Sequence, residues 1–158
     1  MRRLRAIVLP ACGLLGAASA FAQACTVTAS GVAFGSYNPL ASVPTDATGL
    51  VTVSCAANPI ALVLGYSIAL SAGGSGSVAA RSMSAGANAL GYQLYRDAPR
   101  SAVWGDGSGG SSPLAGGLLL SLLLPASAAH PIYGRIPALQ AGTRAGSYGD
   151  TLTVTVSY

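Results

Sequence analysis

Few side chains in this sequence of 158 residues could carry out acid–base or metal chemistry. Asp97 and Asp106 could be imagined as a carboxylate pair, but both lie in loop-like stretches beside arginine or glycine, which is typical of solvated loop aspartates. His130 is the only histidine, so a metal site would need aspartates to complete it, and we expect a surface histidine before Pro131. The sequence therefore predicts no catalytic, cofactor-binding or metal residues.

The sequence gives equally little support to a nucleophilic serine or to a ligand-binding loop. A Ser-His-Asp triad can be assembled on paper, but the chain has no Gly-x-Ser-x-Gly elbow. The glycine-rich stretch Gly105–Gly110 lacks the Lys-Ser/Thr ending and the following helix of a phosphate-binding loop, which favours a simple turn. Trp104 and the seven tyrosines could form a sugar-binding platform, although packing inside a sandwich is favoured. Arg135 could pair with Asp150 or Asp106 to hold a turn.

The beginning of the chain has the pattern of a secretory signal peptide. A short arginine-rich segment is followed by an apolar run and then by small residues. We expect cleavage after Ala22, which gives a signal peptide of residues 1–22 and a mature domain of residues 23–158. Cleavage after Ala24 and a lipoprotein signal at Cys25 are the alternatives. The apolar run falls short of the roughly 20 residues that a permanent membrane anchor needs.

Export determines what the cysteines can do. Cys12 is removed with the signal, so Cys25 and Cys55 can pair only with each other in an oxidising compartment. A loop of about 30 residues closed by a disulfide contributes about 3–4 kcal/mol in the chain-entropy model. Alternation within Leu50–Ala56 points Cys55 toward the core, where it can reach Cys25. Two free buried thiols are the alternative.

The composition favours strands. The mature chain lacks Lys and Glu and is rich in Gly, Ser, Thr, Ala and Val, as expected of strands and tight turns rather than helices. Five scattered arginines oppose four aspartates, a net charge of +1, which excludes a nucleic-acid-binding face. About 135 residues suit one domain.

Short apolar or alternating runs between turn residues indicate a β-sandwich. The predicted strands are Cys25–Ala29, Leu50–Ala56, Ile60–Ser71, Ala89–Arg96, Leu118–Leu124, Pro131–Arg135 and Thr151–Tyr158. We interpret Leu118–Leu124 as a strand buried on both faces, because Gly116, Gly117 and Pro125 flank it. The last strand is the clearest, since one of its faces carries only Leu152, Val154, Val156 and Tyr158.

Several segments, in this order, resemble a known family. The resemblance begins at the first mature cysteine and continues through Phe34–Tyr37, Val51–Cys55, Arg81–Met83, Leu90–Tyr95, Trp104–Gly107, Tyr133–Pro137 with Gln140, and Ala145–Thr151. Each segment alone is a weak signal, whereas their order and spacing are fairly specific. Together they resemble the spore coat protein U domain family, whose relatives include the pilins of archaic chaperone–usher systems.

The resemblance implies an all-β, immunoglobulin-like sandwich that lacks its final strand. A groove along the core would then bind a strand from a periplasmic chaperone and later one from a neighbouring fibre subunit, with assembly at an outer-membrane usher. We expect the apolar face of the last strand, Leu152, Val154, Val156 and Tyr158, to line that groove. The resemblance also implies passage through the periplasm to the cell surface or an extracellular fibre, without a membrane span after signal cleavage.

Only Gln23 and Ala24 precede the first mature cysteine after the expected cleavage. Two residues reach about 7 Å, whereas a donor strand of ten residues spans about 33 Å. The expected subunit therefore receives a strand without donating one, as at a terminal or tip position of a fibre. A free-standing secreted coat or matrix protein and a small lectin-like adhesin are the alternatives, and an enzyme is not expected.

Overall fold

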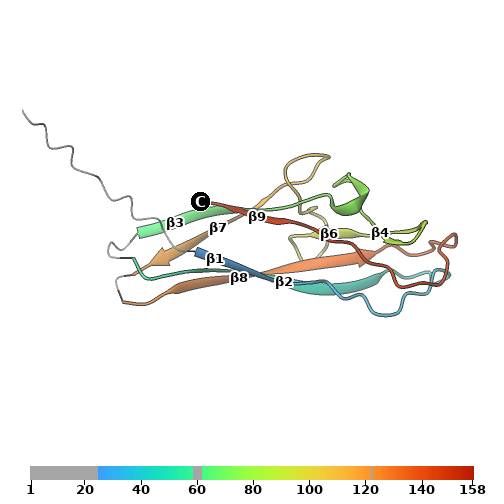
Figure 1. Cartoon of the computed structure of the whole chain (residues 1–158), viewed down its shortest axis with the longest axis horizontal. Helices are drawn as coiled ribbons and strands as arrows, with labels where there is room; N and C mark the ends of the chain where they lie inside the picture. Colours follow the sequence, from blue (N-terminus) through green and yellow to red (C-terminus); the bar gives the residue numbers. More distant parts are fainter. Residues whose placement is uncertain (1–24, 59–61, 122) are drawn as a thin grey trace, which may run out of the picture.

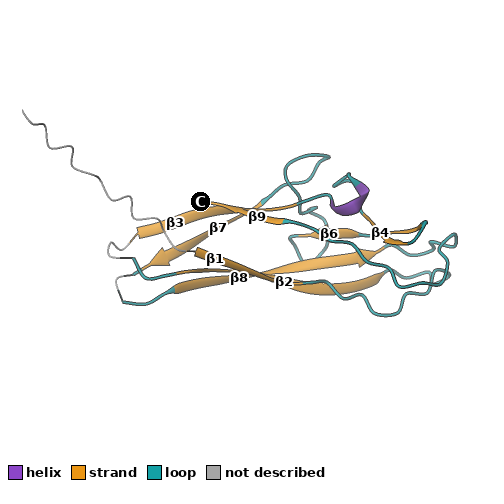
Figure 2. Ribbon diagram, viewed as in Figure 1, coloured by secondary structure: helices purple, strands orange, loops and turns teal. Residues whose placement is uncertain are grey.

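The computed structural model describes residues 25–58, 62–121 and 123–158, so the predicted signal peptide lies outside the described residues. Nearly all regular structure in these ranges is β-strand, with one short 3-10 helix, η1 (Gly73–Ser75) (Figure 2). The strands are β1 (Cys25–Ser30), β2 (Thr45–Cys55), β3 (Leu62–Leu70), β4 (Ser82–Ala85), β5 (Asn88–Gly91), β6 (Gln93–Tyr95), β7 (Leu114–Leu120), β8 (Ala126–Ile136) and β9 (Val154–Ser157).

The strands form two layers that face each other (Figure 1). One sheet has the order β1-β2-β8-β6 and the other has the order β7-β3-β9, while β4 and β5 form a separate hairpin. All pairings between these strands are antiparallel. The predicted all-β sandwich is confirmed.

The core lies between the layers because each central strand alternates. On β2, Val51, Val53 and Cys55 are buried while the residues between them are partly exposed. On β3, the buried residues are Tyr66, Ile68 and Leu70. Trp104 has no exposed surface, and its indole Nε1 donates to the Ile68 carbonyl at 2.9 Å, so this ring packs inside as expected and cannot bind a ligand at the surface.

A disulfide joins strands β1 and β2 at one end of the four-stranded sheet. Cys25 begins β1 and faces Cys55, the last residue of β2, directly across the antiparallel pair. The Cα atoms of the two cysteines are 4.0 Å apart. The bond ties edge strand β1 to the central strand beside it.

The predicted strand Leu118–Leu124 was wrong in its bounds and in the expected burial of both faces. The strand is β7, which ends at Leu120 and contains Gly116 and Gly117 instead of following them. A Cβ atom at Gly116 would lie 2.5 Å from the Tyr66 ring, so glycine is needed there for the ring to pack across the sheet. Leu120 is fully buried whereas Leu119 is 72% exposed, so only one face of the strand meets the core.

Other strand boundaries also differ from the prediction. The predicted strand Ala89–Arg96 is two strands, because the chain leaves the β4–β5 hairpin at Gly91 and joins β8 at Gln93. Strand β8 begins at Ala126, before the predicted Pro131, and the short β4 was missed. Proline is tolerated at position 131 because β6 pairs only with residues 133–135, which leaves β8 open on one side there.

Among the described residues, one charged side chain is buried. Arg81 is 1% exposed, and its guanidinium donates to the carbonyl oxygens of Leu70 and Ser71 and to Oε1 of Gln93. Burial lowers the pKa of Arg81, and the three acceptors compensate for the loss of water. Arg81 thereby fixes the end of β3 to β6.

Candidate partner-binding groove

Two edge strands leave the sandwich open along one side. β1 pairs only with β2, and β9 pairs only with β3, among the strands of the described residues. Each strand therefore presents one row of main-chain N–H and C=O groups without a neighbouring strand. Such an edge is a template for pairing with another chain.

The side chains of both edge strands show that the core is uncovered between them. Val27 lies opposite the buried Val53 and shares its face of the sheet, yet Val27 is 39% exposed. On the other sheet, Val154 and Val156 lie opposite the buried Leu70 and Ile68, respectively, and remain half-exposed. Side chains that face the core but contact solvent indicate a missing layer of protein.

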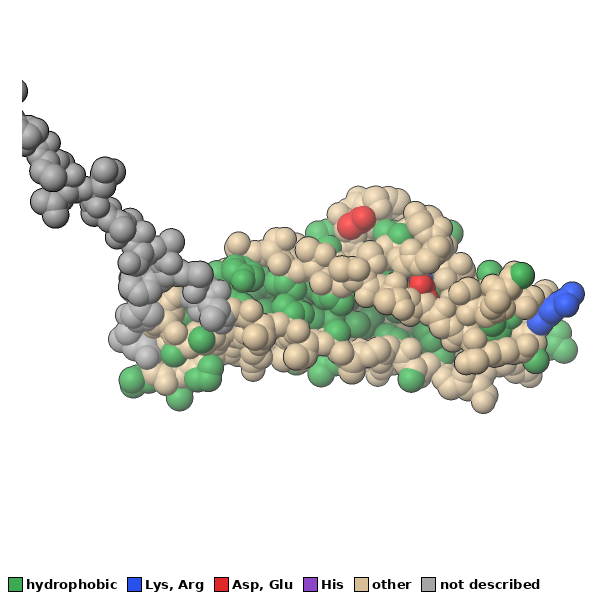
Figure 3. Space-filling model, viewed as in Figure 1, with side chains coloured by type: hydrophobic (Ala, Val, Ile, Leu, Met, Phe, Trp, Pro, Cys, Tyr) green, Lys and Arg blue, Asp and Glu red, His purple; other side chains and the backbone are tan. Residues whose placement is uncertain are grey.

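Figure 3 shows hydrophobic side chains exposed in a long hollow between the β9 side and the β1 side of the sandwich. One part of this hollow, the near cavity, has a volume of about 270 Å³. Its floor includes Leu70, Leu94 and Ile132, and its walls include Ala29 of β1 and Val154 of β9. The near cavity is therefore bounded by one strand of each sheet.

A second and larger part, the far cavity, continues the hollow beyond both strands. It has a volume of about 770 Å³ and shares Val32, Phe34, Met83 and Tyr148 with the near cavity. One wall is the segment that follows β1, and the other is residues 143–148, which precede β9. We call the two cavities together the groove.

The walls of the far cavity are also short of hydrogen-bond partners. In the described part of the chain, the main-chain groups of residues 31–36 and 145–148 make no hydrogen bond. Unpaired backbone on both walls can bind an extended segment in the same way as a sheet edge.

Asp150 fixes the segment that precedes β9 to the body of the domain. The Tyr92 hydroxyl donates to Asp150 Oδ2 at 2.6 Å, and the Gly74 N–H donates to Oδ1 at 2.8 Å. Burial, assisted by the bond to Asp150, raises the pKa of Tyr92, so the hydroxyl keeps its proton and donates. A Cβ atom at Gly73 would collide with the Asp150 carboxylate, which explains the glycine in this tight contact. One wall of the groove is thus held in place without any partner.

The predicted groove residues fall into two groups. Leu152, Val154 and Val156 pack partly buried against the core cluster, and Leu152 and Val154 line the near cavity. Tyr158 follows the end of β9 and is 60% exposed. That these four side chains line a partner groove stays a prediction.

Sequence reasoning missed the opposite wall of the groove. Val27 and Ala29 alternate with threonines in β1, a pattern that could have placed them on one face. Phe34 packs edge-on against Tyr92, with ring centroids 6.1 Å apart. The position of Phe34 follows from long-range contacts, so local pattern alone could not assign it to the groove.

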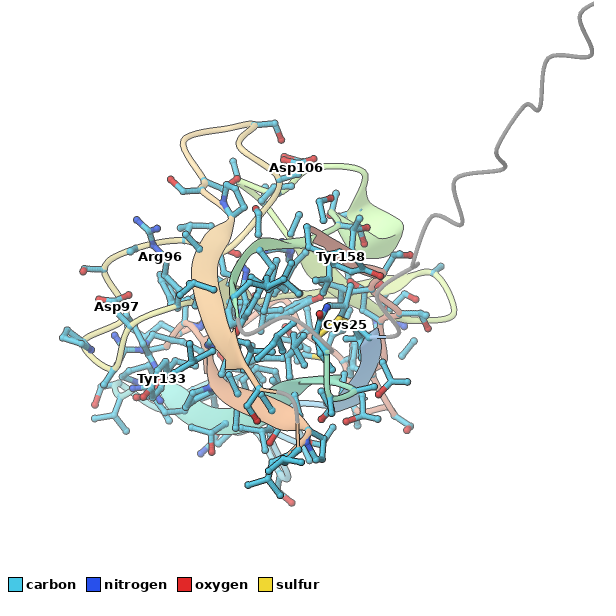
Figure 4. All side chains as sticks on the ribbon, turned by 90° about the vertical axis from the view of Figure 1, so that its left-hand side faces the viewer. Cys25, Arg96, Asp97, Asp106, Tyr133 and Tyr158 are labelled. Carbon is cyan, nitrogen blue, oxygen red and sulfur yellow. A yellow bond between two sulfur atoms is a disulfide. The ribbon has the colours of Figure 1, made fainter. Side chains whose placement is uncertain are left out.

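The remaining candidate residues are structural. Asp97 and Asp106 lie in separate surface loops (Figure 4), where their carboxylates accept hydrogen bonds from Ser101 and Ser108, respectively. These bonds lower the pKa of both aspartates, as expected of turn-capping carboxylates and opposite to what a general acid requires.

The expected partner of Arg135 was wrong, and His130 lies at the surface only in part. His130 is half-buried on β8, and its Nε2 lies 2.6 Å from the Tyr66 hydroxyl; burial lowers its pKa. Arg135 pairs with Asp46, with bonds of 2.7 and 2.8 Å, instead of with Asp150 or Asp106. Asp46 and Arg135 face each other across β2 and β8, a register that local sequence does not specify.

The described residues contain no group of three or more His, Cys, Asp or Glu side chains that could hold a metal ion. Within them, no helix has the length and apolar character needed to cross a membrane.

A solved structure has a similar fold. It is a chain in the crystal structure of the CsuC-CsuE chaperone-tip adhesion subunit pre-assembly complex from archaic chaperone-usher Csu pili of Acinetobacter baumannii, with a TM-score of 0.56 and 19% sequence identity. The similarity covers 87% of this chain and 40% of that chain, so this protein spans less than half of its structural relative. No curated protein matches at a significant level.

A family model gives the assignment. The model described as the Spore Coat Protein U domain matches residues 11–155, which is most of the sequence. The family match indicates a structural rather than an enzymatic protein. The chain belongs to the Spore Coat Protein U domain family.

Proposed function

We propose that this protein is an exported structural subunit of a surface fibre or pilus, and that a strand donated by another chain fills its groove. The observation that carries the proposal is the pair of open edges, β1 and β9, whose core-facing side chains remain exposed. A strand inserted between them would pair with both edges and join the two sheets. The fold shared with a chain of an archaic chaperone-usher complex supports the same function.

The free energy available in the groove is large. A donated strand that offers about four apolar side chains, each contributing about 1.5–3 kcal/mol on burial, adds about 6–12 kcal/mol before costs. The whole stability of a typical domain is about 5–15 kcal/mol. Filling the groove would therefore decide whether the domain is stable, which makes a free-standing coat or matrix protein the less favoured function.

The proposed partners follow from this incompleteness. A periplasmic chaperone would first supply a strand, a neighbouring subunit would replace it, and an outer-membrane usher would coordinate the exchange. The route would lead from the periplasm to the cell surface or an extracellular fibre. A terminal or tip position depends on the residues before Cys25, which lie outside the described residues, and it stays a prediction.

Complementation in cis tests the proposal. The natural chain and a fusion that carries a turn and a ten-residue alternating apolar strand after Tyr158 would be exported to the periplasm and compared. We expect the natural chain to aggregate or be degraded, because it exposes apolar surface beside unpaired strand edges. The fusion should be a soluble monomer in gel filtration, with a cooperative unfolding transition.

The control is a fusion of the same length whose added residues are polar and do not alternate. It should behave like the natural chain, because its side chains cannot fill the near cavity. A natural chain that forms a stable, well-folded monomer without any added strand would contradict the proposal and favour the free-standing coat or matrix protein.

The burial of the aromatic side chains argues against the lectin-like alternative, which needs an exposed aromatic platform. Trp104, the largest aromatic side chain, is fully buried, and Tyr66 and Tyr92 belong to the core. Among the aromatic side chains of the described residues, Tyr158 is the exposed one, and it follows the end of β9.

A further inference from the structure

The groove carries an unbalanced charge at one end. Arg144 is exposed and lies in the wall of the far cavity, where it is the only charged residue among the described residues that line it. Its guanidinium has no hydrogen-bond or ion-pair partner among the described residues. The other described arginines are engaged: Arg81 and Arg96 donate to main-chain carbonyls, and Arg100 and Arg135 pair with Asp46.

The near cavity carries a negative charge, whereas the far cavity carries a positive one. Asp150 is the only charged residue that lines it within the described part of the chain, and both carboxylate oxygens already accept hydrogen bonds, from Tyr92, Gly74 and Thr151. The buried Arg81 is close enough to interact with Asp150 electrostatically, so the negative charge is partly balanced. The groove therefore has an engaged carboxylate in the near cavity and a free guanidinium at the far cavity.

We propose that the groove selects a strand, donated by a neighbouring subunit, that places a carboxylate side chain at the end entering the far cavity. The inference rests on the proposed function. The unpaired main chain of residues 31–36 and 145–148 would hold the strand in register, and Arg144 would bind its carboxylate. Arginine suits this role because its planar guanidinium can donate two parallel hydrogen bonds to a carboxylate.

The proposed contact also orients the donor. The uncharged floor of the groove accepts alternating apolar side chains in either direction. A strand with a carboxylate at one end would bind better with that end beside Arg144 than reversed, where the carboxylate would lie beside the end of β9 and no basic side chain of the described residues lines the near cavity. Charge at an exposed rim contributes to specificity and register more than to affinity.

A strand fused after Tyr158 has a known direction and allows a direct test. It must turn back and run antiparallel to β9, so its C-terminal end enters the far cavity. About ten residues at about 3.3 Å each reach from the end of β9 to the segment around Tyr148. The tenth residue would be Glu, Gln or Lys in three otherwise identical fusions, each followed by a neutral Gly-Ser tail that keeps the terminal carboxylate away.

The readout is the equilibrium constant of unfolding in urea, measured at low and high salt. We expect the Glu fusion to be about two- to fivefold more stable than the Gln fusion, and the Lys fusion to be the least stable. The advantage of Glu should disappear in Arg144→Gln and in about 1 M salt, which screens exposed charges beyond about 3 Å. Arg96→Gln is the matched control, because Arg96 lies outside both cavities, and it should leave the advantage unchanged.

The outcomes separate the two proposals. If all three fusions are stabilised equally relative to the polar control strand, the donor fills the groove but Arg144 does not select its end, and the inference is wrong. The same conclusion follows if the Glu advantage survives Arg144→Gln. If no fusion is more stable than the polar control, the groove does not accept a strand and the proposed function itself fails.

Discussion

Val27 offers a sharp test of whether a donated strand covers the groove. It faces the core from edge strand β1 but is 39% exposed, whereas its neighbour Thr28 points to the outer face and is exposed. In the fusion that carries an apolar strand after Tyr158, Val27 would be covered and Thr28 would not. We therefore compare Val27→Asp with Thr28→Asp in that fusion.

The magnitude follows from burial. Complete burial of a valine contributes about 1.5–3 kcal/mol, and all of it is lost in Val27→Asp. The new carboxylate would lie between two apolar layers. If burial raises its pKa by about two units, the free energy of unfolding falls by roughly a further 2.7 kcal/mol at neutral pH. We expect a total loss of about 4–6 kcal/mol, against less than about 1 kcal/mol for Thr28→Asp.

The assay is urea unfolding as a function of pH. A carboxylate whose pKa is raised in the folded state binds more protons folded than unfolded, so its penalty is small below the unfolded pKa of about 3.9 and grows as the pH rises. Val27→Asp should thus be least destabilising in acid. Equal effects of the two substitutions at neutral pH would show that Val27 remains solvated in the fusion and would refute the covered groove.

Three further predictions concern the fold and use the same stabilised fusion. Arg81→Met should lower the free energy of unfolding by about 3 kcal/mol or more, because it leaves buried acceptors unpaired; an unchanged urea midpoint would contradict this. Leu120→Ala should cost about 2–5 kcal/mol and Leu119→Ala less than about 1 kcal/mol, since only Leu120 is buried; similar costs would contradict the assigned register. Bonding to Arg135 lowers the pKa of Asp46, so its contribution is present above the unfolded pKa and is lost as the pH falls through the lower folded value. Asp46→Asn should remove no more than about 1 kcal/mol, with the full loss above about pH 4 and none once the pH is below the lowered folded pKa.

The sequence was sufficient for features that depend on local pattern. Alternation in β2 correctly placed Cys55 on the buried face, and the apolar face of the last strand was correctly assigned for Val154 and Val156. Both strands have a period of two with contrasting residues on their faces, which is the strongest signal that a strand can give. The family resemblance supplied the sandwich and the idea of an open side.

Features that depend on tertiary contacts were not predictable. The pairing of Arg135 with Asp46 follows from the register of β2 against β8 over 89 residues of sequence separation. The two glycines inside β7 were placed outside the predicted strand as its flank, because nothing nearby in sequence reveals the Tyr66 ring that packs on Gly116. The far cavity lies between two segments without regular structure, so no periodicity marked its residues.

The residues of the two open edges provide a further argument that these edges are meant to be paired. Proteins that fold alone usually protect an exposed edge strand with a charged side chain, a proline or a bulge. Neither β1 nor β9 contains a charged residue or a proline, and both pair in an uninterrupted register with one neighbour. The other two edge strands differ in length or composition. Strand β6 is only three residues long and offers little to an incoming chain, whereas β7 also lacks charge and proline but contains Gly116 and Gly117, which weaken a strand. A strand that carries only Val, Thr, Ser, Ala or Cys on an open edge would promote aggregation in a free-standing domain. The same composition suits an edge that a donated strand will cover.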